Sequence, residues 1–238
     1  MWNDEEKAIF IQVLKEYGPD LADEQIDMLL QYSSKVVEEN QKVNLTAITK
    51  PEEFAVKHII DSLLVLDHVS AKSIVDVGTG AGMPGLIWAI VYRDCQYLLL
   101  DSLKKRVKFL GQTVSLLGLD NVKYLHSRAE EAAKASSIRE SFDIATARAV
   151  ASFQVLLEYC LPFVKIGGKF IALKGPDAKE EVTSSKKALA ILGGEIEYIY
   201  DYQLPLDMGD GSLIVVKKVA TTPKKYPRKP GTPTKSPL

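Results

Sequence analysis

Cysteine, histidine and long apolar runs are scarce in this chain. Its 238 residues include two cysteines, Cys95 and Cys160, which lie in apolar surroundings outside any Cys-x-x-Cys pair. The three histidines are scattered, so the sequence shows no spacing typical of a metal site. No apolar run approaches the ~20 residues of a membrane span, and the acidic N-terminus lacks the core of a secretory signal. These absences predict a cytoplasmic protein with reduced thiols, no resident metal and no membrane partner.

A strong overall charge is also missing. The net charge is −1, but residues 220–238 hold five Lys or Arg and no acid, so this tail contributes +5 and the rest of the chain −6. A nucleic-acid partner would therefore have to be held by local basic surfaces. Five of the eleven prolines also lie in this tail. Its composition is compatible with disorder as well as with a binding segment.

Glycine, in contrast, is concentrated after the first apolar strand. Residues 73–77 form an apolar run, four glycines follow within eight residues, and residues 86–91 can start a helix. Strand, glycine turn and helix are the first unit of a nucleotide-binding, doubly wound α/β sheet. Glycine is favoured in such a turn because it adopts positive φ without penalty and lets backbone N–H groups approach a ligand.

The side chain that separates the possible ligands of this turn is Asp76. The spacing Gly80-x-Gly82-x-x-Gly85 matches the dinucleotide fingerprint, so the glycines alone do not decide. A carboxylate at Asp76 would repel a pyrophosphate at the helix N-terminus, whereas it suits the ammonium and sulfonium groups of S-adenosylmethionine. Pro84 also removes an N–H that a phosphate could use. We therefore favour S-adenosylmethionine and keep an NAD(P)-binding oxidoreductase as an alternative.

The order of the predicted elements extends this unit into a full sheet. Residues 4–68 show helical apolar spacing, and from Ser73 five strands alternate with helices. Two further strands around the turn at 207–211 predict a closing hairpin. This pattern is typical of the α/β class I S-adenosylmethionine-dependent methyltransferase (Rossmann-like) sheet. We expect an N-terminal helical segment (1–68) packed on a methyltransferase domain (69–219), followed by the basic tail (220–238).

Ligands of such sheets bind outside the carboxyl ends of the strands, where several polar side chains are expected. Asp101 lies 19 residues beyond Gly82, a spacing typical of an acid that accepts from ribose hydroxyls, although it could instead cap the next helix. Glu130 could contact the adenine or serve as a first-turn helix acid. Arg148 follows an apolar strand and needs a partner in a pocket. A basic stretch that could track phosphates or form a solvated helix face comprises Lys104, Lys105 and Arg106.

Seven short motifs occur together in a combination that is specific. They are Asn44-Leu-Thr-Ala-Ile48, His58-x-x-Asp61-Ser62, Asp76-Val-Gly-Thr-Gly-Ala-Gly-x-Pro-Gly85, Ser127-Arg-Ala-Glu130, Ala147-Arg-Ala-Val150, Leu173-Lys-Gly175 and Arg228-Lys-Pro-Gly-Thr-Pro233. This combination resembles the RsmG family, also called glucose-inhibited division protein B, from about Asn44 to the C-terminus. The resemblance implies methylation of N7 of a guanine in 16S ribosomal RNA, free or in the small ribosomal subunit, with S-adenosylmethionine as donor.

The resemblance also implies site residues. It implies that the cofactor contacts include Gly78, Met83, Ala129, Glu130 and Arg148. The turn and the strand ends add four further expected cofactor contacts, Asp76, Gly80, Gly82 and Asp101. Many family members have Phe in place of Met83, and because both side chains are bulky and apolar, cofactor packing should survive. The expected RNA-binding residues are Asn44, Lys104, Lys105, Arg106, Lys174, Arg228 and Lys229.

Methylation at N7 makes few demands on catalytic side chains. Guanine N7 carries a lone pair in the major-groove edge and has no proton to lose, so the reaction needs no general base and no covalent intermediate. Alignment alone can contribute ~7–11 kcal/mol. Arg148 is the candidate catalytic residue, expected to brace the pocket or to contact O6 or a phosphate. A non-catalytic RNA-binding ribosome-assembly factor with this fold is the second alternative.

Overall fold

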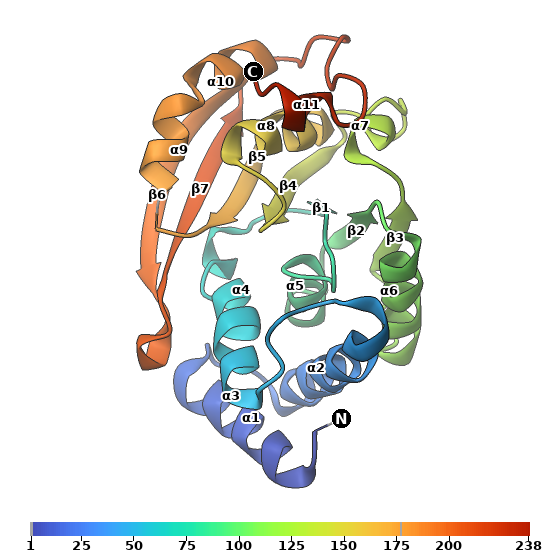
Figure 1. Cartoon of the computed structure of the whole chain (residues 1–238), viewed down its shortest axis with the longest axis vertical. Coiled ribbons are helices and arrows are strands. Elements are labelled where there is room, and N and C mark those ends of the chain that lie inside the picture. The colour runs from blue at the N-terminus through green and yellow to red at the C-terminus, as the bar shows by residue number, and fades with distance from the viewer. Residues whose placement is uncertain (1, 177) are drawn as a thin grey trace.

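A seven-stranded sheet forms the centre of the molecule, as the computed structural model shows for the described residues 2–176 and 178–238 (Figure 1). The strand order is β3-β2-β1-β4-β5-β7-β6, with parallel pairing from β3 to β5 and antiparallel pairing of β7 with both of its neighbours. This arrangement confirms the fold class predicted from the sequence. The strands are β1 (Ser73–Val77), β2 (Gln96–Asp101), β3 (Val122–His126), β4 (Phe142–Arg148), β5 (Val164–Lys174), β6 (Gly194–Gln203) and β7 (Asp210–Lys218).

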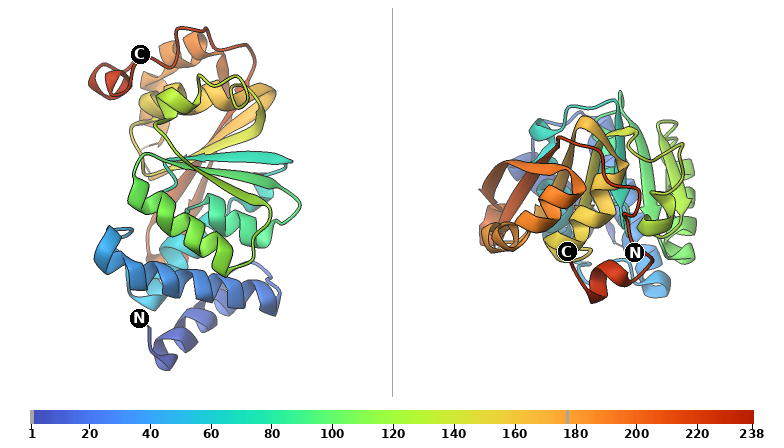
Figure 2. Two further views of the ribbon diagram at one scale, coloured as in Figure 1. Left: turned by 90° about the vertical axis from the view of Figure 1, so that its right-hand side faces the viewer. Right: turned by 90° about the horizontal axis from the view of Figure 1, so that it is seen from above.

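Helices cover both faces of the sheet (Figure 2). Successive strand residues point to opposite faces, so Ile74 belongs to one apolar core and Val75 to the other. The first core includes α5 (Gly85–Val91) and α6 (Lys104–Leu116). The helices over the second core are α7 (Ala129–Ala132), α8 (Phe153–Cys160), α9 (Ala178–Ser184) and α10 (Lys186–Leu192).

The N-terminal segment adds a further helical layer beneath α5 and α6 (Figure 2). Several hydrogen bonds join it to the sheet domain; among them, the Trp88 indole N–H donates to the Ser62 carbonyl (2.7 Å) and the Tyr32 hydroxyl donates to the Ala81 carbonyl (3.1 Å). Its apolar residues belong to the first sheet core. The domain boundaries near residues 68 and 219 stay predictions. The segment consists of α1 (Asp4–Tyr17), α2 (Asp23–Val43), α3 (Pro51–Phe54), the π-helical turn η1 (Ala55–Ile60), α4 (Asp61–Leu63) and the 3-10 turn η2 (Leu66–His68).

After β7 the chain crosses the α7 and α8 side of the molecule and ends beyond α11 (Thr232–Lys235) (Figure 1). Two more 3-10 turns, η3 (Leu161–Phe163) and η4 (Pro205–Asp207), join the later elements. Throughout residues 2–176 and 178–238, none of the helices combines the length and apolarity that a bilayer crossing requires.

Candidate functional site

The glycine turn after β1 is shaped by close contacts that exclude side chains. Gly78 has φ of +73°, and a Cβ there would stand 2.8 Å from a methyl carbon of Val150. A Cβ on Gly85 would meet the Asp76 carboxylate at 2.8 Å. Glycine is therefore required at Gly78 for both backbone conformation and space, and at Gly85 for space alone.

Asp76 lies beneath this turn and holds it. Its side chain is 1% exposed, and Oδ2 accepts hydrogen bonds from the Thr79 hydroxyl (2.6 Å) and the Gly85 N–H (2.9 Å). Burial raises the pKa of Asp76 to about 7, although these two bonds act in the opposite direction. Within the described residues, the buried Oδ1 has no hydrogen-bond partner. The carboxylate is thus a brace for the turn and does not form part of the cavity wall above it.

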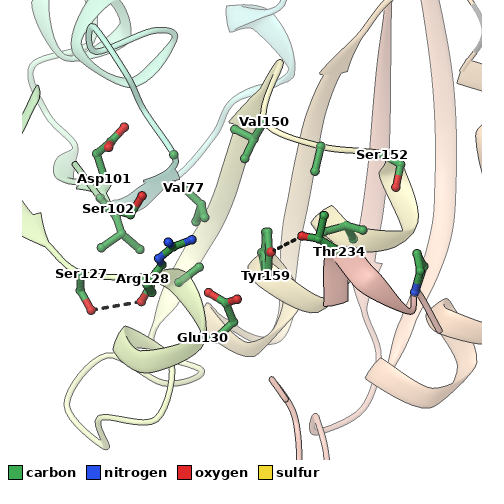
Figure 3. Close-up of a pocket in the computed structure, with 16 residues that line it drawn as sticks. Val77, Asp101, Ser102, Ser127, Arg128, Glu130, Val150, Ser152, Tyr159 and Thr234 are labelled. Atoms are coloured by element: carbon green, nitrogen blue, oxygen red, sulfur yellow. Dashed lines mark hydrogen bonds between the residues drawn. The ribbon is translucent and has the colours of Figure 1, made fainter. Parts of the chain in front are cut away.

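A cavity of about 400 Å³ opens at the carboxyl ends of β1, β2 and β4 (Figure 3). This volume is within the usual range for small-molecule sites. Its lining residues come from four strand-to-helix connections, α8 and the tail. They are Val77, Gly78, Leu100, Asp101, Ser102, Ser127, Arg128, Ala129, Glu130, Val150, Ala151, Ser152, Val155, Tyr159, Thr234 and Pro237. We refer to it as the first cavity.

Asp101 is fixed in the wall of the first cavity by backbone donors. Oδ2 accepts from the Gly80 N–H (3.0 Å) and Oδ1 from the Leu103 N–H (2.8 Å). Each carboxylate oxygen has two lone pairs, so Asp101 can still accept hydroxyl donors from a ligand. Its bond to Leu103, the residue before α6, holds the connection rather than capping the helix, and it leaves the expected ribose contact open.

Glu130 stands at the other end of the first cavity (Figure 3). It belongs to the first turn of α7 and is 2% exposed. Its Oε1 accepts a hydrogen bond from the N–H of Gly231, which is 101 residues away in the chain. The tail therefore helps to orient a side chain expected to contact the cofactor.

The structure separates the predicted cofactor residues into groups. Gly78, Asp101, Ala129 and Glu130 line the first cavity. Outside its wall, Asp76 and Gly80 support the turn through the bonds given above, and Gly82 and Met83 are buried. Arg148 is not among the residues that line the first cavity.

Arg148 faces a second cavity of about 400 Å³ on the other side of the β4–α8 connection. Its Nη1 donates to Asp61 (2.8 Å), to the Ser62 hydroxyl (3.2 Å) and to the His58 carbonyl (3.4 Å). The Tyr202 hydroxyl donates to the other oxygen of Asp61 (2.7 Å). Arg148 thus fastens the N-terminal helices to the end of β4. Residues lining the second cavity are Lys57, Asp61, Arg148, Ala149, Leu173, Lys174, Gly175, Tyr202, Leu204, Met208, Asp210 and Gly211.

The predicted RNA-binding residues do not form one surface. Lys174 lines the second cavity, where its ammonium pairs with Glu181 (2.8 Å). Two of the predicted arginines turn inward: Arg106 lies 3.6 Å from the Asp101 carboxylate, and Arg228 pairs with the buried Glu158 at 2.6 Å. The residues of this set with exposed side chains are Asn44, Lys104, Lys105 and Lys229.

Sequence reasoning missed several residues of the first cavity. Ser127, Arg128 and Val150 lay inside motifs recognised in the sequence, so their positions were available although no role was assigned to them. Tyr159 and Thr234 had no local signal, because they come from α8 and the tail and meet only in the folded chain, through a 3.0 Å hydroxyl–hydroxyl contact (Figure 3).

The residues present fit S-adenosylmethionine. Gly78 lines the cavity where a Cβ would collide with Val150, so its bare backbone faces the ligand space, and Asp101 has free lone pairs at the expected ribose position. Asp76 lies outside the cavity wall and contributes indirectly, by holding the glycine turn through Thr79 and Gly85. No group of three or more His, Cys, Asp or Glu side chains that could hold a metal occurs in ranges 2–176 and 178–238.

The sheet order, the glycine turn and the strand-end cavity define a class I S-adenosylmethionine-dependent methyltransferase. A solved structure of a putative O-methyltransferase from Klebsiella pneumoniae shares this fold, with a TM-score of 0.54 at 16% identity, over 91% of this chain and 98% of that one.

Sequence comparison shows the family to which the chain belongs. The family model GidB, described as rRNA small subunit methyltransferase G, matches residues 25–204. Ribosomal RNA small subunit methyltransferase G of Acetivibrio thermocellus is 49% identical over 98% of this chain and 96% of its own length, and that of Alkaliphilus metalliredigens is 46% identical over 98% and 99%. The chain belongs to the rRNA small subunit methyltransferase G family. This confirms the resemblance found in the motifs, and both alternative functions give way to an rRNA methyltransferase.

Proposed function

We propose that this protein transfers a methyl group from S-adenosylmethionine, held in the first cavity, to N7 of a guanine in 16S ribosomal RNA that enters the second cavity, and that it does so in the cytoplasm. The observation that carries the proposal is the wall between the cavities. Ala149 lines the second cavity, whereas Val150 and Ala151 line the first. A donor and an acceptor would therefore be separated only by the short connection after β4.

The bound donor supplies a methyl group on a positively charged sulfonium. Asp101 would hold the ribose hydroxyls, and Glu130 would orient the adenine end. Asp76 braces the turn on which Gly78 approaches the ligand. Because ligands at this sheet edge reach the carboxyl ends of the strands, the methyl group is expected beside the Ala149–Val150 connection.

The second cavity would hold the RNA through charge and shape. Lys57, Arg148 and Lys174 lie in its wall, and only Asp61 and Asp210 oppose them there among the described residues. Arg148 already donates to Asp61, Ser62 and the His58 carbonyl, which supports a positioning role, bracing the wall, over direct contact with guanine O6. Since N7 loses no proton, the residues need only align it with the methyl group.

The test is methyl transfer from labelled S-adenosylmethionine to unmodified 16S RNA and to unmodified small subunits, followed by nucleoside analysis. We expect the label in 7-methylguanosine. Label in another nucleoside would contradict the N7 assignment, and RNA binding without incorporation would contradict catalysis. Lys174→Ala should reduce transfer, whereas Lys217→Ala, which removes an exposed lysine at the opposite edge of the sheet, should not.

A further inference from the structure

The C-terminal tail is fastened to the body at two places before it reaches the first cavity. Arg139 donates to the carbonyls of Thr222 (2.8 Å) and Tyr226 (3.0 Å). Arg228 then binds Glu158 through Nε (3.0 Å) and Nη2 (2.6 Å), and its own N–H donates to the same carboxylate (2.7 Å). Glu158 is 1% exposed. A charge-assisted, bidentate pair with a buried carboxylate fixes both position and direction.

Beyond Arg228 the tail becomes part of the cavity itself (Figure 3). The Gly231 N–H binds the Glu130 carboxylate (2.9 Å), and the Thr234 hydroxyl contacts the Tyr159 hydroxyl (3.0 Å). Thr234 and Pro237 line the cavity together with Glu130 and Tyr159. One wall of the first cavity is therefore made by residues that would leave if the tail detached.

We propose that the tail is the outer wall of the cofactor site, so that cofactor binding and tail docking are thermodynamically linked. Gly231 and Thr234 are positioning residues, since they act on the cofactor through Glu130 and Tyr159. The positive charge of Arg228 is neutralised by Glu158, which separates this role from the RNA grip predicted from tail composition. Whatever loosens the tail then weakens cofactor binding, and bound cofactor holds the tail in place.

The test compares two charge-neutralising substitutions in the tail of the full chain. Arg228→Gln removes the fastening outside the cavity, and Lys224→Gln removes the same charge from an exposed side chain. Binding of S-adenosylhomocysteine is measured by calorimetry. We expect Arg228→Gln to raise Kd by about tenfold, as for loss of a charged hydrogen bond, and Lys224→Gln to leave Kd unchanged. Equal Kd values for the two variants would overturn the proposal.

Two milder substitutions serve if Arg228→Gln lowers stability. Thr234→Val and Tyr159→Phe each remove one hydroxyl of the contact at the cavity wall. Each should raise Kd about threefold, and the double variant should match the single ones because they break the same contact. Fully additive effects, or none, would contradict a wall made jointly by α8 and the tail.

Linkage also predicts an effect in the reverse direction. Trypsin cleavage at the exposed Lys224 and Lys225 should slow at least fivefold in saturating S-adenosylhomocysteine, and Arg228→Gln should cancel part of this protection. Cleavage at the same rate with and without ligand would overturn the linkage.

This inference rests on the proposed function, because it takes the first cavity to be the cofactor site. If the unaltered chain fails to bind S-adenosylhomocysteine, the proposed function fails. If the unaltered chain binds and Arg228→Gln binds equally well, only the inference about the tail fails. A tail that serves RNA alone would leave both Kd values unchanged, while each variant lowered the salt slope of RNA binding by about one.

Discussion

The two cavities at the carboxyl edge of the sheet are built by different means. In the first, the carboxylates of Asp101 and Glu130 are held by backbone N–H groups of the glycine turn, the next connection and the tail. In the second, side chains hold one another: Arg148 binds Asp61, which also accepts from Tyr202. The difference indicates that a small ligand of fixed shape is suited to the first cavity, whereas the second, whose wall has three cations against two carboxylates, is suited to a polyanion.

The largest effect is expected on cofactor affinity, from a substitution in the wall of the first cavity. Asp101→Ala removes the acceptor for the Gly80 and Leu103 N–H groups as well as the expected ribose contact. Charged hydrogen bonds contribute about 1.5–3 kcal/mol each, so Kd for S-adenosylhomocysteine should rise about 100-fold or more. RNA affinity should remain as in the unaltered chain. Calorimetry and RNA gel shifts check both, and a parallel loss of RNA binding would contradict the division between the cavities.

The pH dependence of stability tests two buried groups, Asp76 beneath the glycine turn and His58 beside Arg148. Burial raises the pKa of Asp76 to about 7, while burial and then the charge of Arg148 lower that of His58 to about 3. Between pH 4 and 6.5 the folded chain keeps a proton on Asp76 that the unfolded chain loses, so this group lowers the free energy of unfolding as pH rises. His58 acts oppositely, because there the unfolded chain holds the extra proton.

The two slopes, each up to about 1.4 kcal/mol per pH unit, should largely offset one another in the unaltered chain. Relative to it, Asp76→Asn should make the free energy of unfolding rise with pH over this window, and His58→Gln should make it fall. Urea unfolding at pH 4.5, 5.5 and 6.5 measures both. Slopes that match the unaltered chain in both variants would show that neither group is perturbed as described.

Arg148→Ala should disturb the second cavity alone. It leaves Asp61 mostly buried without its cation, a change that typically costs about 3 kcal/mol. Methyl transfer should fall while Kd for S-adenosylhomocysteine stays within about threefold. Lys165→Ala is the matched control, since its pair with Asp143 is more exposed and should cost under ~1 kcal/mol. Unchanged stability and transfer in Arg148→Ala would remove this residue from the site.

The smallest effect is expected for Lys174→Ala. Lys174 lines the second cavity, but its ammonium pairs with Glu181 and donates to the Ala151 carbonyl, so only part of its charge would reach RNA. We expect the KM for RNA to rise about fivefold to tenfold without a change in cofactor Kd. Steady-state kinetics on small subunits test this, with Lys217→Ala as the control. A change in cofactor Kd instead would show that the bond from Lys174 to the Ala151 carbonyl supports the first cavity, and an unchanged KM would contradict a role in RNA binding.

The sequence was most informative where a site is local. The turn from Asp76 to Gly85, the acid at the end of β2 and the Ala129-Glu130 pair are each defined by a short stretch, and the structure places Gly78, Asp101 and Glu130 in the wall of the first cavity. Asp76 was expected to attract the ligand by charge. Its burial beneath the turn could not be seen in the sequence, because it depends on donors from Thr79 and Gly85.

Contacts between distant segments were not accessible in the same way. Arg148 and Asp61 are 87 residues apart, and Arg228 and Glu158 are 70 apart. The need of Arg148 for a partner was predictable, but the identity of that partner was not. The sequence showed only that Arg228 is basic, and this charge suggested that it binds RNA. Its partner, the buried carboxylate of Glu158 on α8, is far away in the sequence. Pairing of charges across the fold decides which basic residues remain available to a polyanion.

The most direct measurement is a crystal structure of the chain with S-adenosylhomocysteine. We expect the ribose hydroxyls on Asp101 and the sulfur directed at the connection between Ala149 and Val150. We expect the adenine beside Ala129 and Glu130, where the tail covers the cavity. A ligand bound in the Arg148 cavity, or a sulfur atom turned away from that connection, would contradict this placement.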